Sequence, residues 1–215
     1  MKCSCCIKTM DFWNQFIKKL HRDAKEPKEI VVELTNHLQK PSLVLDIGCG
    51  RGRHLSYLSD HGCVIIATDI SVDALQHCSM QLRRDKKRIF FVNNDITQLC
   101  FRRESFDAVI ATNSLHYNTL DKIRKSIREI HAVLKPYGWL AASFASSSML
   151  YRNGLEIEKN TFIREAQGTS VIQHFFDEQE IKSLFGRFTI VKMYETRDDS
   201  REETEGHWYV LAQKR

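Results

Sequence analysis

The sequence predicts an α/β fold in which helices cover both faces of a doubly wound, mostly parallel sheet. Three observations predict it. From residue 42 onward, short apolar runs typical of buried strands alternate with segments of helical periodicity. The first run, "SLVLDIG", leads directly into the glycine-rich loop "GCGRG". The last two runs follow each other with no helical segment between them, so we expect them to pair antiparallel.

Two helices are expected before the alternation begins. Residues 10–20 place apolar side chains on one helical face, and Pro27 can open a second helix that Pro41 stops. At 215 residues the chain is long enough for one domain with a real core. We therefore expect an N-terminal helical cap over residues 1–40 and one main domain over residues 41–215.

The predicted strands of the main domain are "SLVLDIG" (42–48), "CVIIATD" (63–69), "RIFFVNND" (88–95), "FDAVIATN" (106–113), "WLAASFA" (139–145), "FTIVKMYE" (188–195) and "HWYVLAQK" (207–214). The predicted helices cover residues 52–61, a segment capped by Ser71 and reaching residue 82, residues 120–134 and residues 177–185. Residues 146–176 interrupt the alternation after the fifth strand, and we expect a lid insert there. Within it, "TFIREAQGTSVIQHFF" is typical of a hairpin that turns near Gln167 and Gly168.

Composition excludes some classes of protein. The formal charge of +5 is compatible with a polyanionic partner without requiring one. No apolar run approaches the roughly 20 residues that span a bilayer, and the N-terminus lacks the apolar core of a signal peptide. Seven cysteines are an odd number, and most fall beside predicted buried elements, which favours the reducing cytoplasm. Cys3, Cys5 and Cys6 lack a fourth ligand at usable spacing, so we expect unpaired thiols and no metal.

The glycine loop after the first strand is typical of a nucleotide-binding turn, but its spacing excludes two common kinds. Gly48, Gly50 and Gly52 stand at every second position. The dinucleotide fingerprint needs a glycine at the sixth position, which is Arg53 here. The P-loop needs Gly-Lys-Ser/Thr, which is absent from this loop.

Three carboxylates end three successive strands: Asp46, Asp69 and Asp95. In a doubly wound sheet the ligand binds beyond these strand ends. Carboxylates there repel phosphates but suit hydroxyls, amines and a positive centre, the groups that S-adenosylmethionine (SAM) carries. Taken alone, Asp69 could be a helix cap and Asp95 a turn former. All three carboxylates stand at strand ends, as the glycine loop does, and this shared position favours a binding site.

The motifs "LDIGCGRG", "TDIS", "NNDI", "FDAVIATNSLHY" and "LKPYGWL" occur in one consistent order. This pattern resembles the class I SAM-dependent methyltransferases. The resemblance implies a Rossmann-like, seven-stranded sheet with its last strand antiparallel, SAM as the cofactor and S-adenosylhomocysteine as the product. The turn at Pro136-Tyr137-Gly138 departs from the family's Pro-Gly-Gly, in a place away from the site.

The resemblance also implies roles for the residues at matching positions. Those that would hold the cofactor are Gly48, Cys49 and Gly50 beneath it, Asp46 near the methionyl ammonium, Asp69 at the ribose hydroxyls, Asp95 at the adenine amine, Ile70 and Ile96 against the adenine faces, and Asn113 and Leu115 along the methionyl side.

The sequence gives weaker evidence for the residues that bind the methyl acceptor than for those that bind the cofactor. His116 and Tyr117 follow the fourth strand and are the candidate catalytic residues. His116 could be a general base, or it could pack beneath the adenosyl group or the lid. The segment 146–176 and the C-terminal strands resemble the tellurite-resistance and thiopurine-like methyltransferases. Residues that could reach an acceptor, with packing or a solvated face as the alternative, are Trp13, Arg152, Arg164, His174 and Trp208.

The expected function is methyl transfer to a small-molecule acceptor. One alternative is an RNA methyltransferase, because part of the pattern also resembles the enzymes that complete wobble-uridine modification in transfer RNA. The basic runs "RRDKKR" (83–88) and "FRRE" (101–104) could then contact phosphates. Another alternative is a SAM-binding adaptor without catalysis. The sequence predicts neither the acceptor atom nor the oligomeric state.

Overall fold

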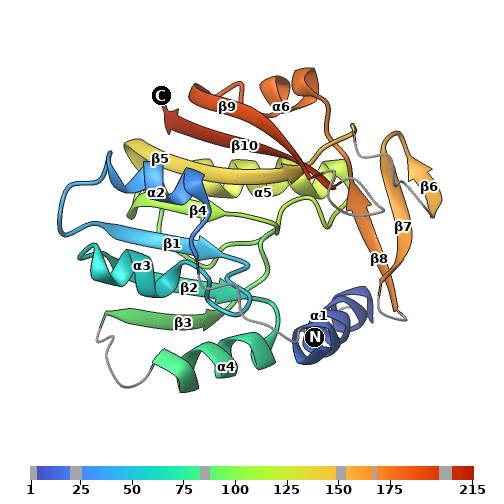
Figure 1. The fold of residues 1–215 in the computed structure, drawn as a ribbon, viewed down its shortest axis with the longest axis horizontal. Coiled ribbons are helices and arrows are strands. Elements are labelled where there is room, and N and C mark those ends of the chain that lie inside the picture. The colour runs from blue at the N-terminus through green and yellow to red at the C-terminus, as the bar shows by residue number, and fades with distance from the viewer. Residues whose placement is uncertain (1–3, 20–25, 83–87, 149–153, 167–168, 199–204) are drawn as a thin grey trace.

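The computed structural model of the chain describes residues 4–19, 26–82, 88–148, 154–166, 169–198 and 205–215. Its centre is a seven-stranded sheet in the order β3-β2-β1-β4-β5-β10-β9 (Figure 1). The first five strands pair parallel wherever they are neighbours. The strands of this sheet are β1 (Leu43–Ile47), β2 (Val64–Asp69), β3 (Ile89–Asn93), β4 (Phe106–Ala111), β5 (Leu134–Ala145), β9 (Phe188–Asp198) and β10 (Glu205–Lys214).

Helices cover both faces of this sheet, as the alternation predicts. One face packs against α2 (Glu29–Thr35), α3 (Leu55–Asp60) and α4 (Val72–Leu82). The other packs against α5 (Leu120–Val133) and α6 (Glu178–Leu184). Both faces of the central strands are therefore buried, which explains why these strands are continuous apolar runs.

The last strand, β10, is antiparallel to both of its neighbours, β5 and β9. Its residues Val210, Leu211 and Ala212 are fully buried in the middle of the sheet. The predicted antiparallel pairing of the two C-terminal runs is confirmed. The seven-stranded sheet with an antiparallel last strand, which the family resemblance implied, is confirmed as well.

The insert after β5 forms a second sheet of three strands: β6 (Leu155–Glu158), β7 (Thr161–Ala166) and β8 (Thr169–His174). The predicted hairpin corresponds to β7 and β8, which pair antiparallel from Thr161–His174 to Ala166–Thr169. Its turn at residues 167–168 lies outside the described residues. Strand β6 was not predicted: its residues, Leu-Glu-Ile-Glu, do alternate, but the run is only four residues long and all four are exposed.

Other element boundaries also differ from prediction. Helix α3 begins at Leu55 rather than Gly52, because residues 51–54 form turns after the glycine loop. The helix predicted over residues 120–134 ends at Val133, and strand β5 begins at Leu134. Within β5, Tyr137 adopts a φ of 61°. Helix α1 (Ser4–Lys19) starts six residues before the predicted Met10.

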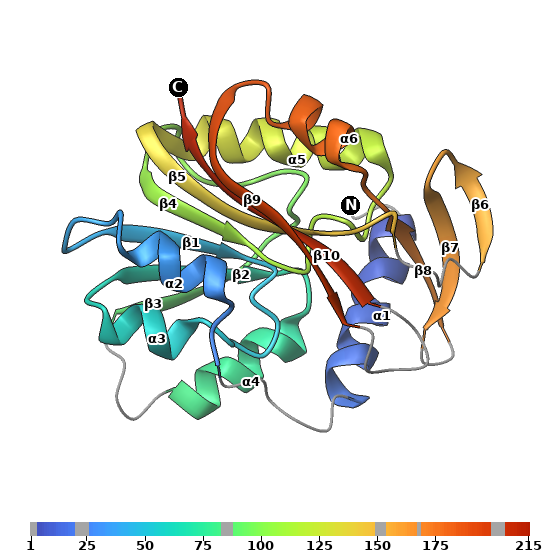
Figure 2. The same ribbon diagram turned by 45° about the horizontal axis from the view of Figure 1, so that its top comes forward.

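The two N-terminal helices have different environments. Helix α2 buries Ile30, Val31 and Leu34 in the core on one sheet face. Helix α1 lies apart from the sheet, near the carboxyl ends of its strands, and contacts α4 and β8 (Figures 1 and 2). Within the described part of the chain, no helix is long and apolar enough to cross a membrane.

Candidate functional site

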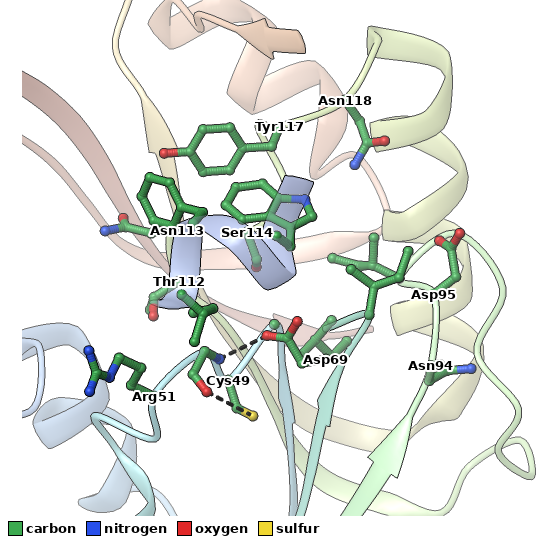
Figure 3. Close-up of a pocket in the computed structure, with 18 of the residues that line it drawn as sticks. Cys49, Arg51, Asp69, Asn94, Asp95, Thr112, Asn113, Ser114, Tyr117 and Asn118 are labelled. Atoms are coloured by element: carbon green, nitrogen blue, oxygen red, sulfur yellow. Dashed lines mark hydrogen bonds between the residues drawn. The ribbon is translucent and has the colours of Figure 1, made fainter. Parts of the chain in front are cut away.

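A cavity of about 330 Å³ opens where the carboxyl ends of β1, β2 and β4 meet, with α1 over one side. Its wall includes ten of the residues that the sequence singles out. These are Trp13, Gly48, Cys49, Gly50, Asp69, Ile70, Asp95, Ile96, Asn113 and Tyr117. Figure 3 shows Tyr117 and Asp69 on opposite sides of this cavity.

The glycine loop forms the cavity floor, and its conformation requires glycine. Gly48 and Gly50 have φ values of 67° and 54°, in the left-handed region. A Cβ on Gly48 would lie 2.6 Å from the Cβ of Ser114, so the loop after β4 approaches too closely for any side chain there. A Cβ on Gly50 would meet no atom within 4 Å. The backbone of Gly50 therefore faces open space.

Asp69, at the end of β2, connects the glycine loop to the start of α4. Its Oδ2 accepts a hydrogen bond from the Gly50 amide (2.9 Å), and its Oδ1 accepts one from the Ser71 amide (2.8 Å). Burial raises the pKa of this carboxyl, although both amide hydrogen bonds oppose the rise. The carboxylate is thus held in one orientation at the cavity wall, where its remaining lone pairs can accept from a ligand.

The far end of the cavity carries Asn94 and Asp95 (Figure 3). Asp95 Oδ1 accepts from the amide and the hydroxyl of Thr97, both at 2.8 Å. Three buried side-chain atoms of residues on the cavity wall, His54 Nε2, Asn94 Oδ1 and Ser114 Oγ, have no hydrogen-bond partner among the described residues. Because buried polar atoms are nearly always paired, these atoms indicate a polar ligand.

Helix α1 closes one side of the cavity with aromatic side chains. Trp13 meets Tyr117 edge to face, with 4.9 Å between the ring centroids, and Phe16 lines the same wall. A hydrogen bond from Ser71 Oγ to Asn14 Oδ1 (2.7 Å) and an ion pair between Lys18 and Asp73 (3.0 Å) hold α1 against α4.

Three residues predicted for the site lie behind the cavity wall instead. Leu115 is fully buried in the core. Asp46 is buried with its Oδ2 3.7 Å from His54 Nδ1. His116 is fully buried and packs 4.4 Å from the Tyr117 ring, measured between centroids. Burial, with the neighbouring His207 and His174, lowers the pKa of His116 to about 3, so it is neutral at physiological pH.

Three of the predicted acceptor residues, Arg164, His174 and Trp208, are not part of this cavity's wall, and their polar atoms have protein partners. Arg164 donates to Gln173 (2.6 Å). His174 bonds to Thr161 (2.6 Å) and Glu180 (3.2 Å). Trp208 donates to the Phe176 carbonyl (3.1 Å). Arg152 lies outside the described residues.

Several residues of the cavity wall were not predicted. They are Ile17, Ile47, Arg51, Arg53, His54, Asn94, Thr97, Thr112, Ser114, Asn118 and Lys122. Most of them stand within three positions of a predicted residue, in the glycine loop or after β3 and β4. Lys122 differs, because it comes from α5, where a lysine has the spacing of a solvated face. No sequence signal distinguishes it.

The wall fits SAM on chemical grounds. Two carboxylates, Asp69 and Asp95, can accept from hydroxyls and amines, and Ile70 and Ile96 offer flat apolar contact. The three unpartnered atoms add an amide oxygen, a hydroxyl and an imidazole nitrogen. Among the described residues there is no group of three or more histidine, cysteine, aspartate or glutamate side chains that could hold a metal ion.

Comparison with known proteins agrees with this geometry. Residues 44–138 match the family model described as "Methyltransferase domain". The fold matches a Burkholderia thailandensis 1,6-didemethyltoxoflavin-N1-methyltransferase whose structure holds S-adenosylhomocysteine, with a TM-score of 0.74 and 22% identity over 98% of this chain and 88% of that one. Residues 44–138 are therefore similar to a methyltransferase domain. The match to the family model begins in β1 and ends in β5, so it contains the glycine loop, all three carboxylates and Tyr117.

Two further likenesses concern the fold and the sequence. The fold also matches TehB from Haemophilus influenzae, with a TM-score of 0.68 and 17% identity over 94% of this chain and 67% of that one. In sequence, 120 residues are 35% identical to an Arabidopsis thaliana tRNA (carboxymethyluridine(34)-5-O)-methyltransferase, covering 55% of this chain and 27% of that protein. The chain spans less than half the length of this relative and of the mouse NDUFAF5 arginine-hydroxylase that it also matches.

Proposed function

We propose that this chain transfers a methyl group from SAM to a small-molecule acceptor. The observation that carries the proposal is the pair of carboxylates, Asp69 and Asp95, facing one cavity whose floor is the glycine loop. SAM, when bound, supplies a methyl group on a sulfonium centre, which is already activated for displacement.

The chain's own residues would bind and orient the cofactor. Asp69 would accept from the ribose hydroxyls and Asp95 from the adenine amine, with Ile70 and Ile96 against the adenine faces. Gly50 would let the backbone pass close beneath. Since Asp69 is fixed by two backbone amides, little conformational entropy is lost when it engages a ligand.

Catalysis would come mainly from positioning in a site that excludes water. Tyr117 lines the cavity and is the candidate that could touch an acceptor, and Trp13 would close over it. His116 lies directly behind Tyr117, and with a pKa near 3 it is a weak base. We therefore assign His116 a positioning role beneath Tyr117.

The small size of the acceptor is supported by the aromatic closure of the cavity by α1. Arg164, His174 and Trp208 would act by holding the insert sheet in place rather than by contacting the acceptor, since their polar atoms are engaged within the protein. A second candidate function is methyl transfer to RNA. The specific observation in its favour is the 35% identity to a tRNA methyltransferase.

The test is a transfer assay with SAM that carries a radiolabelled methyl group. The protein is incubated separately with a metabolite extract, with total RNA and with a protein extract. We expect label in the metabolite fraction only. Label in RNA that ribonuclease removes would replace the small-molecule proposal with the RNA one. SAM binding with no label in any fraction would indicate an adaptor.

A further inference from the structure

A second cavity, of about 300 Å³, lies between α5 and α6, at the edge of the core on that face of the sheet. Its floor is apolar, with Ile127, Leu184 and Phe188. Its edge is basic, with Arg124, Arg128, His131 and Arg187. We name this cavity the α5–α6 groove.

Arginines outnumber carboxylates on the described groove wall. In the described part of the chain, the exposed side chains of Arg128 and Arg187 make no ion pair or hydrogen bond. Arg124 has a long contact to the exposed Asp121 (3.7 Å). Glu180 is the one carboxylate on the described groove wall, so three arginines face a single carboxylate there.

The pKa of His131 indicates the same excess of positive charge. Burial lowers the pKa of His131, and the charges of Lys214, Arg187 and Arg103 lower it further. Of these three cations, Lys214 pairs with Glu104 (3.6 Å), whereas Arg187 has no ion pair among the described residues. Cations in excess of carboxylates raise the free energy of the protein alone and favour a bound anion.

The arrangement along α5 suits an extended anion better than a compact one. Arg124, Arg128 and His131 stand at i, i+4 and i+7, so they share one face of the helix. At about 1.5 Å per residue, the row from Arg124 to His131 covers about 10 Å along the helix. Lys122, two residues before Arg124, lies on a different face of α5 and lines the cofactor cavity instead.

We propose that the α5–α6 groove binds a single strand of RNA through its phosphodiester backbone. Guanidinium groups match phosphate oxygens in a bidentate geometry, and a partly exposed imidazole beside an apolar floor offers a surface for a base. The proposal deepens the second candidate function, on which its biological role rests. Binding itself does not depend on methyl transfer.

The test is fluorescence anisotropy of a fluorescein-labelled, unstructured 12-nucleotide RNA with the full chain at increasing salt. We expect Arg128→Ala and Arg187→Ala each to weaken binding about threefold or more, and each to reduce the salt slope by about 0.7. Lys159→Ala is the matched control, because Lys159 is an exposed cation in the β6–β7 turn, outside the groove. It should change the affinity less than the groove variants do.

Two further measurements keep the outcomes distinct. Calorimetry with SAM on the same variants should show unchanged affinity, which would demonstrate that their fold is intact. Because SAM binding is measured separately, failure of the RNA proposal would not count against the proposed cofactor site. Absence of salt-dependent RNA binding, or equal binding by the groove variants, would overturn the proposal. A poly-glutamate peptide or phosphatidylserine vesicles that bind as tightly as RNA, with the same loss in the variants, would overturn RNA as the occupant.

Discussion

Trp13 and Tyr117, 104 positions apart in the sequence, meet edge to face across the cofactor cavity with their ring centroids 4.9 Å apart. This contact joins α1, which lies apart from the main sheet, to the loop that follows β4. Through this aromatic pair, the helix that closes the cavity is in contact with the loop that carries the candidate catalytic residues.

Replacing Trp13 with alanine should speed the loss of bound SAM. Such aromatic pairs contribute about 0.5–1.5 kcal/mol beyond the area they bury, so we expect about a three- to tenfold weaker affinity. Trp13→Phe keeps an aromatic edge and should lie close to wild type. Retention of labelled SAM after addition of excess unlabelled SAM measures the rate, and identical rates for Trp13→Ala and wild type would contradict closure by α1.

Asp69→Ala should weaken SAM binding by about 1–3 kcal/mol, because the ribose hydroxyls and the Gly50 amide would lose their acceptor. Asp69→Asn keeps one carbonyl oxygen and should fall between the alanine variant and wild type. Isothermal titration calorimetry measures all three. An unchanged dissociation constant for Asp69→Ala would mean that this carboxylate does not contact the cofactor.

Much of this site could be predicted because local chemistry determines it. A glycine loop after a buried strand needs positive φ values, and Gly48 and Gly50 have them. Carboxylates that end parallel strands must gather at one edge of the sheet, and Asp69 and Asp95 do so. These features depend on the residues of one segment and on the parallel order of the strands. Both can be recognised in the sequence, as a motif and as the alternation of strands and helices.

The remaining features depend on contacts between distant segments. Ser114, Leu115 and His116 are consecutive, yet only Ser114 lines the cavity, because the direction of each side chain depends on how the loop after β4 packs. Likewise, His174 was a candidate for acceptor binding, but Thr161 and Glu180 occupy its two ring nitrogens. Hydrogen bonds between residues of different segments cannot be predicted from a single sequence.

Gly48→Ala should destabilise the fold more than Gly50→Ala. Both glycines have positive φ, so each alanine costs about 1–2 kcal/mol of backbone strain. At Gly48 the new Cβ would also collide with the Cβ of Ser114 at 2.6 Å, whereas at Gly50 it meets nothing within 4 Å. Urea unfolding measures the difference.

The double variant Gly48→Ala/Ser114→Gly is the control for this comparison. It removes the Cβ that the alanine would strike, so its free energy of unfolding should rise towards that of Gly50→Ala. Equal stability of Gly48→Ala and Gly50→Ala would contradict the close approach of the two loops.

The buried His116 predicts a loss of stability in acid. Its pKa is about 3 in the folded protein and about 6.5 in the unfolded chain, so below pH 6.5 the unfolded state binds the extra proton. Stability is therefore present above this window and falls as the pH drops through it. Between pH 7 and pH 5 this one group should cost about 2 kcal/mol.

His116→Gln removes the titration at this position. Its free energy of unfolding in urea should depend on pH less steeply than that of wild type over the same range, whatever its stability at pH 7. Parallel pH profiles for the two proteins would show that His116 takes up its proton in the folded state.

The central claim is that the cavity beneath α1 binds SAM, and thermal unfolding with ligands tests it most directly. A ligand that binds only the native state raises the melting temperature, and the rise grows with the logarithm of the ligand concentration divided by its dissociation constant. We predict that saturating SAM and S-adenosylhomocysteine raise it, that NAD does not, and that Asp69→Ala reduces the shift. No shift with SAM, or an equal shift with NAD, would contradict the assignment of this cavity.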